Sequence, residues 1–179
     1  MSITEDGSVL VAAGKEIVFV SLATGTRKRV GELNSPVAAS ALSSRFGFLC
    51  VVDVNKHLHF ADLKTRNLLS AITLPFSPMR FLYIDDKRGR VYVPMWDDKS
   101  LTSFLSVVDL TKRSLIATVS LRPGLLGMLC VEGDQVWVSM LDRILLLDPD
   151  TLEYQDEIHT GMYPFSLHFR PSISINKSN

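Results

Sequence analysis

The chain has 179 residues, and its 19 Lys and Arg residues balance its 19 Asp and Glu residues, so the formal net charge is zero. This balance argues against a general binder of nucleic acids or acidic membranes, which usually carries a basic excess. A hydrophobic share of 46% is typical of a globular chain. No apolar run reaches the length of a membrane-spanning helix, and the first residues lack the basic and apolar regions of a signal peptide. We therefore expect a cytoplasmic protein without membrane insertion.

A strand–turn–strand unit recurs along the chain. Its copies occupy residues 17–33, 58–74, 105–121 and 144–160, and they start 39 to 47 residues apart. The fifth position, where the turn begins, holds Ser21, Asp62, Asp109 and Asp148. Short polar side chains suit this place because they accept hydrogen bonds from nearby backbone N–H groups. Each copy therefore predicts two antiparallel strands joined by a polar turn.

Two further strands are predicted before each copy, because segments rich in β-branched and aromatic residues precede it. The nearer strands are residues 9–12, 48–52, 90–93 and 135–138. The farther ones, each after a proline, are residues 37–42, 79–84 and 125–131. Four short strands that repeat about every 40–47 residues are typical of β-propeller blades. A β-sandwich also contains many short strands, but it does not require the internal similarity.

The predicted architecture is all-β, with three complete four-stranded blades and a fourth blade divided between the two ends. Residues 2–4 are the remainder of a first strand, and residues 165–169 form a first strand with no blade after it. We expect blades over residues 1–170 and a polar disordered tail over 171–179. Three arrangements stay open: a closed four-bladed ring, a part of a larger propeller, or two arcs that pair. An open arc would expose blade edges and self-associate.

Two stretches resemble known propeller repeats. Residues 17–25, Ile-Val-Phe-Val-Ser-Leu-Ala-Thr-Gly, are similar to the WD-repeat string of a hydrophobic strand followed by Thr-Gly. Residues 160–165, in which a Gly and a Pro precede a strand, resemble the opening of a YVTN-type blade. The likeness covers nearly all of residues 5–169. It departs from the WD pattern because no Gly-His pair opens a blade, and because the Trp position holds Val20, Ala61, Val108 and Leu147.

The resemblance implies a non-catalytic scaffold that binds a protein or peptide partner. The degenerate blades are also similar to the C-terminal propellers of large cytoplasmic signalling proteins, which implies a signalling or trafficking context. The alternative is a ligand-binding or catalytic propeller, such as a lectin-like protein or a quinoprotein-type oxidoreductase. Those proteins direct polar residues toward the central channel, whereas the corresponding strands here repeat mostly apolar residues.

A longer segment in the third blade is the candidate partner site. Residues 94–104 lengthen this blade, and blade insertions often emerge as loops on the binding face. Met95, Trp96 and Phe104 are the expected apolar anchors, with Asp97 on the polar rim. The alternative is a long hairpin on which Trp96 folds back.

Other candidate sites carry weaker patterns. His57 and His59 share one face of a predicted strand, but a zinc site needs at least three protein ligands and no third is evident nearby. Asp53 and Asn55 lack the spacing of a calcium loop and are expected to serve the turn. Cys50 and Cys130 lie in apolar strands and are expected to pack as small hydrophobic residues. We therefore expect no metal, no cofactor and no catalytic residues.

Overall fold

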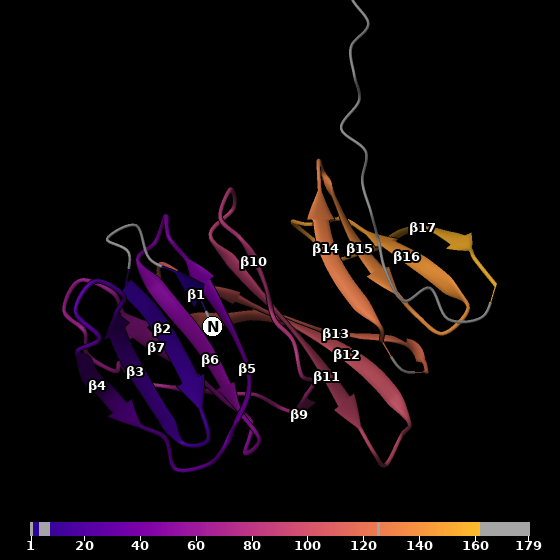
Figure 1. Cartoon of the computed structure of the whole chain (residues 1–179). Coiled ribbons are helices and arrows are strands. Elements are labelled where there is room, and N and C mark those ends of the chain that lie inside the picture. The colour runs from indigo at the N-terminus through magenta and orange to yellow at the C-terminus, as the bar shows by residue number, and fades with distance from the viewer. Residues whose placement is uncertain (1, 4–7, 125, 162–179) are drawn as a thin grey trace, which may run out of the picture. The chain divides into compact units, whose positions relative to one another are not determined.

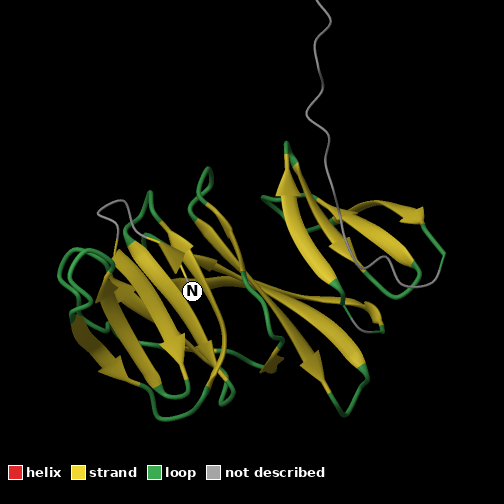
Figure 2. Ribbon diagram, viewed as in Figure 1, coloured by secondary structure: helices red, strands yellow, loops and turns green. Residues whose placement is uncertain are grey.

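The computed structural model describes residues 2–3, 8–124 and 126–161 (Figure 1). Over these ranges the chain consists of strands and loops (Figure 2), and no helix there is long and apolar enough to cross a membrane. The strands form four antiparallel sheets, as expected for blades. The predicted all-β class is therefore confirmed. The expected strand at 165–169 and the expected tail at 171–179 lie outside the described residues.

Each sheet is a meander in which strands adjacent in sequence are adjacent in space. The first contains β1 (Ser2–Ile3), β2 (Ser8–Ala13), β3 (Glu16–Ser21) and β4 (Arg27–Glu32). The second contains β5 (Val37–Ser43), β6 (Phe48–Asp53), β7 (His57–Asp62) and β8 (Ile72–Thr73). The third contains β10 (Tyr83–Asp85), β11 (Arg90–Asp97), β12 (Thr102–Asp109) and β13 (Ser114–Pro123), and β9 (Ser77–Pro78) also pairs with β11. The fourth contains β14 (Met128–Glu132), β15 (Gln135–Ser139), β16 (Arg143–Leu147) and β17 (Tyr154–His159).

The chain divides into two compact units, residues 1–125 with the first three sheets and residues 126–179 with the fourth. In the first unit the second sheet is covered on both faces, so five of the six residues of β6 are buried. Ile17 and Phe19 of the first sheet pack with Leu49 and Val51 of β6. The other face of the second sheet packs against the third, through residues such as Phe60. Apolar side chains thus stack sheet on sheet, as blades do.

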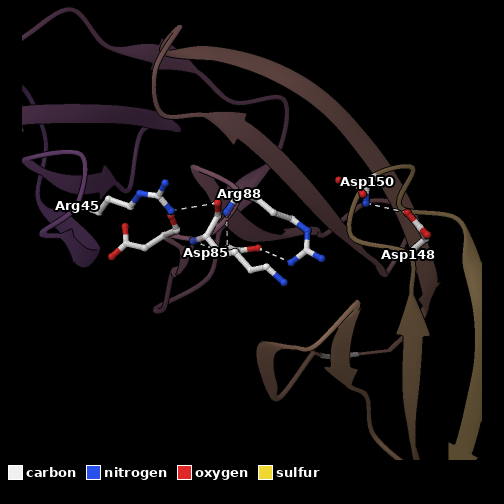
Figure 3. Close-up of polar contacts among 7 residues, drawn as sticks. Arg45, Asp85, Arg88, Asp148 and Asp150 are labelled. Atoms are coloured by element: carbon white, nitrogen blue, oxygen red, sulfur yellow. Dashed lines mark hydrogen bonds and ion pairs between the residues drawn. The ribbon is translucent and has the colours of Figure 1, made fainter.

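The polar turns form as the repeat predicts. The Oδ1 atom of Asp62 accepts backbone N–H groups two and three residues later, both at 2.8 Å. In the second unit the Oδ1 atom of Asp148 does the same at 2.8 and 2.7 Å, and Figure 3 shows its contact with Asp150. The Ser21 hydroxyl accepts the N–H of Thr24 at 3.3 Å. A short polar side chain therefore closes each of these turns by replacing a backbone acceptor.

The first strand of the third sheet differs from the predicted one, and β14 begins at Met128 whereas the predicted strand begins at residue 125. Residues 79–84 were expected to form a full first strand of the third sheet, but only β10 and the short β9 pair with β11. Pro94 explains the interruption, since its carbonyl accepts the N–H of Met79 at 2.8 Å and so faces this side of β11. In an antiparallel ladder the N–H and C=O of one residue point to the same neighbour, and proline has no N–H to donate.

Cys50 packs as the sequence predicts, whereas Cys130 is only partly buried, and this difference has a measurable consequence. Burial, and then the nearby charge of Asp86, raise the pKa of the fully buried Cys50 thiol far above its usual range. Burial and the charge of Glu132 raise the pKa of the partly exposed Cys130 to about 11. Because the thiolate is the reactive form, iodoacetamide at about pH 8 should leave Cys50 unlabelled in the folded chain and label Cys130 slowly.

Mass spectrometry of the labelled chain measures this protection, and the chain unfolded in urea is the control in which both cysteines react. Rapid labelling of Cys50 under native conditions would contradict the packing of the second sheet described above.

Candidate functional site

The insertion at residues 94–104 forms an extended hairpin, which is the alternative to a binding loop that the sequence left open. Strands β11 and β12 have eight residues each, whereas the corresponding central strands of the other sheets have five or six. They stay paired from Arg90 and Asp109 to Asp97 and Thr102, so the extra residues lengthen the ladder. The hairpin projects visibly in Figure 1 and ends in a turn at residues 98–101. We call residues 96–102 the hairpin tip.

Two of the four predicted partner-binding residues point into the fold. Met95 is fully buried in the core between the second and third sheets, and its sulfur accepts the Ser106 hydroxyl at 3.6 Å. Phe104 is directly opposite Met95 in the ladder and stacks on Phe76, with ring centroids 3.9 Å apart. Met95 was predicted to be an exposed anchor, and the structure corrects this because side chains alternate between the faces of a strand. Phe104 is half-buried, so only part of its ring is accessible to a partner.

The other two predicted residues shape the hairpin tip. The indole N–H of Trp96, a half-buried residue, donates to the carboxylate of Asp98 at 2.8 Å. Asp97 accepts the Ser100 hydroxyl at 2.7 Å and the N–H groups of Lys99 and Ser100 at 3.2 Å. These contacts, the Ser100 hydroxyl first, lower the pKa of Asp97 and keep it charged. The tip therefore has a fixed conformation that its own side chains hold.

The sequence analysis missed Leu101 at this tip. Its side chain is 61% exposed, and its backbone has a φ of 52°. Positive φ is unfavourable for residues other than glycine and, to a lesser degree, asparagine and aspartate. Among the described residues, the non-glycine residues with positive φ are Lys56, Arg66, Leu101, Arg113 and Leu152. Leu152 is only 5% exposed, so packing accounts for an apolar side chain there, whereas Leu101 is largely exposed among the described residues.

A second cluster of polar side chains lies at the turn between β6 and β7. The Asp53 side chain is fully buried, and its Oδ1 atom accepts the backbone N–H groups of Asn55 at 3.0 Å and His57 at 2.9 Å. Its Oδ2 atom is 3.0 Å from Nε2 of His59 and 3.4 Å from Nδ1 of His57. The two histidines thus lie on one face as predicted. The expectation that no third ligand is near them was wrong.

The charge of Asp53 is stabilised by its surroundings. Burial alone would raise the pKa of this carboxyl, but the hydrogen bonds from the His59 ring and the His57 N–H outweigh burial and hold it below its usual value. Ser35, a buried residue on the connection between β4 and β5, lowers the pKa further. Its hydroxyl nevertheless makes no hydrogen bond of normal geometry among the described residues. Asp53 is therefore a buried carboxylate that is ionised at neutral pH.

Both groups of residues belong to the same end of the first unit. Each lies where the second strand of a sheet turns into the third, after β6 and after β11. The segment that connects the two sheets contacts both hairpins: the N–H of Leu74 bonds to the carbonyl of Lys56 at 2.7 Å, and the N–H of Met79 bonds to that of Pro94 at 2.8 Å. This end therefore presents an apolar tip and a histidine–carboxylate cluster from neighbouring sheets.

No protein-family model matches the chain, and no curated protein matches its sequence. Solved structures do match it. A chain of a mitotic checkpoint complex aligns with a TM-score of 0.70 and 15% identity over 87% of this chain and 48% of that one. The U3-55K structure aligns with a TM-score of 0.71 and 15% identity, over 90% of this chain and 52% of that one. Kuenenia stuttgartiensis hydrazine synthase aligns with a TM-score of 0.70 and 15% identity, over 89% of this chain and 48% of that one.

The chain therefore spans about half the length of the solved chains that it matches. At 15% identity the likeness concerns the backbone, and function does not follow from a shared fold. The four antiparallel meanders and these alignments together identify the fold as β-propeller-like.

Proposed function

We propose that the chain is a non-catalytic protein-interaction scaffold, and that it binds a protein or peptide segment through the hairpin tip. In this proposal its blades are degenerate relatives of WD-repeat and YVTN-type blades. They form the propeller portion of a cytoplasmic signalling or trafficking protein. Propeller-type solved chains, including one from a mitotic checkpoint complex, support the general role. The observation that carries the specific site is the exposed Leu101 at positive φ.

The energetic argument starts from the strain at Leu101. A left-handed conformation costs a residue with a Cβ about 1–2 kcal/mol. Such strain persists where the surrounding structure enforces it, and it clusters at binding sites. Burying a leucine against a partner contributes about 1.5–3 kcal/mol, which is more than the strain. In this proposal, contact with a partner offsets the strain at the exposed leucine.

The conformation of the hairpin tip is already fixed in the unbound chain. The contacts of Trp96 with Asp98 and of Asp97 with Ser100 already fix the turn. A fixed turn loses little conformational entropy on association, so more of the contact energy appears as affinity. The exposed Asp98 and Lys99 flank the apolar residues. We infer a partner segment with one apolar side chain for the tip and polar groups on either side of it.

Replacing Leu101 with asparagine tests this proposal, because the change should raise the stability of the chain while it weakens binding to a partner. Asparagine tolerates positive φ better than leucine does, so the free energy of unfolding should rise by about 0.5–1 kcal/mol in urea titrations. The same change removes the apolar anchor. The immobilised variant should therefore lose proteins that the wild-type chain retains from a cell extract, and binding of each purified candidate should weaken at least about tenfold.

Leu22 supplies the matched control, since it is 62% exposed and lies just after β3 in the first sheet. Leu22→Asn should leave the retained proteins unchanged. Trp96→Ala should weaken the same interactions as Leu101→Asn, with little change in thermal stability. If Leu101→Asn and Leu22→Asn give the same set of retained proteins, or if Leu101→Asn destabilises the chain, the hairpin tip is not the binding site.

A further inference from the structure

We propose that Asp53, His57 and His59 bind one divalent metal ion of the zinc class. Each of these residues offers one ligand atom, and the three atoms lie within 4.8 Å of one another. They come from a single hairpin, since Asp53 ends β6 and both histidines lie on β7. The site is separate from the hairpin tip and does not depend on the function proposed for it.

The distances within the cluster already approach those of a metal site. In a tetrahedral zinc site the ligands lie about 2.1 Å from the ion, so neighbouring ligand atoms are about 3.4 Å apart. Here Oδ2 of Asp53 is 3.0 Å from Nε2 of His59 and 3.4 Å from Nδ1 of His57. The two rings are tilted by 56°, with centroids 6.0 Å apart. The two imidazole nitrogens lie within 4.8 Å of each other, so side-chain rotation would direct the three lone pairs at one ion.

The carboxylate is held in place by groups that are not ligands. Two backbone N–H groups fix Oδ1 of Asp53, which leaves Oδ2 toward the imidazoles. Such outer hydrogen bonds are what orient a metal ligand and preserve its charge. The buried Ser35 hydroxyl lies beside this carboxylate, but no hydrogen bond of normal geometry joins the two. A metal-bound water would give this hydroxyl a partner of normal geometry.

The ligand set selects the class of ion. Two imidazole nitrogens and one carboxylate suit Zn²⁺ and its first-row neighbours, whereas Ca²⁺ takes six to eight oxygen ligands and Mg²⁺ retains several waters. His57 is 39% exposed, so the cluster opens to solvent on that side. The fourth position is therefore accessible to a water molecule. Three protein ligands and one water are a common zinc coordination.

Calorimetric titration of the full chain with ZnCl₂, after treatment with a chelator, tests the proposal. One Zn²⁺ ion should bind per chain, and Co²⁺ should bind at the same site with the visible absorption of a tetrahedral complex. Saturating Zn²⁺ should raise the melting temperature, since an ion that binds the folded state stabilises it, and Ca²⁺ should not. His57→Gln and His59→Gln should each lower the zinc affinity at least about tenfold, which is the loss seen even for residues that only support ligands.

The matched control is His159→Gln. His159 is an exposed histidine whose Nε2 atom lies 3.2 Å from a carboxylate oxygen of Glu157, in the other unit. Among the described residues no second histidine joins that pair, so its loss should leave zinc binding unchanged. Asp53→Asn keeps an oxygen for the turn while removing the charge, and circular dichroism checks its fold. If it does not fold, the combined His57→Gln and His59→Gln variant decides. Absence of zinc binding, or binding that survives this double change, overturns the proposal.

Discussion

Replacing Phe60 with alanine should lower the free energy of unfolding of the first unit by about 3–5 kcal/mol, the usual cost of truncating a buried aromatic side chain. Phe60 is fully buried on β7, in the core that the second and third sheets share. Its ring also meets Phe48 edge to face, with centroids 6.1 Å apart. The truncation removes apolar burial and leaves a cavity between two sheets that cannot easily close.

Urea titration measures this loss. The chain has two tryptophans, Trp96 in the first unit and Trp137 in the second, so Trp137→Phe leaves Trp96 to report on the first unit alone. In that background the midpoint should fall steeply with Phe60→Ala. Val54→Ala, which truncates an exposed residue of the neighbouring turn, should change the stability by less than about 0.5 kcal/mol. Equal effects of the two changes would show that the second and third sheets do not share a packed core.

Replacing Gly89 with alanine is expected to cost about 2–4 kcal/mol, for two separable reasons. Gly89 has a φ of 67°, which an alanine adopts only with strain. A Cβ atom there would also lie 2.7 Å from Cζ of Phe46 and 3.2 and 3.3 Å from its two Cε atoms. Phe46 cannot move away freely, because its ring packs on the shared core. Arg45 holds its turn against the next sheet through a 2.8 Å bond to the carbonyl of Asp86, near Asp85 and Arg88 in Figure 3.

Gly47 provides the matched control for the strain. It has a φ of 70° and occupies the corresponding turn of the second sheet, but a Cβ atom there would meet nothing within 4 Å. Gly47→Ala should therefore cost only about 1–2 kcal/mol, the strain alone. In a Phe46→Ala background the cost of Gly89→Ala should fall to that of Gly47→Ala, as a double-mutant cycle in urea would show. A full cost that persists without the Phe46 ring would contradict the close packing of these two turns.

The repeat was sufficient to predict the fold class because strands and turns depend on local chemistry. Alternating β-branched residues favour strands, and Asp62 and Asp148 cap their turns through atoms only two or three residues away. Packing of apolar faces then completes the sheets. The sequence did not predict that the strand paired with β11 is interrupted opposite Pro94. This interruption depends on which neighbouring strand Pro94, which has no N–H, faces.

The candidate site was predictable only in part. The sequence located the long hairpin and the histidine pair, since both appear as insertions or spacings along the chain. It placed Met95 at the surface, because a one-residue shift in the alternation moves a side chain from the core face to the solvent face. It also missed Leu101, because no residue type reveals its own φ and leucine is an unusual choice at positive φ.

By itself the sequence determined that this protein is built from short antiparallel strands arranged in successive sheets with polar turns, since those features follow from interactions between residues close along the chain. Only the tertiary structure decided which side chains meet. Asp53 reaches two imidazoles through the pairing of β6 with β7, and the Ser35 hydroxyl lies beside that carboxylate from a different connection. Phe46 packs on Gly89 from the neighbouring sheet. Such contacts depend on strand register and on the packing of one sheet against the next, and neither has a local signature in the sequence.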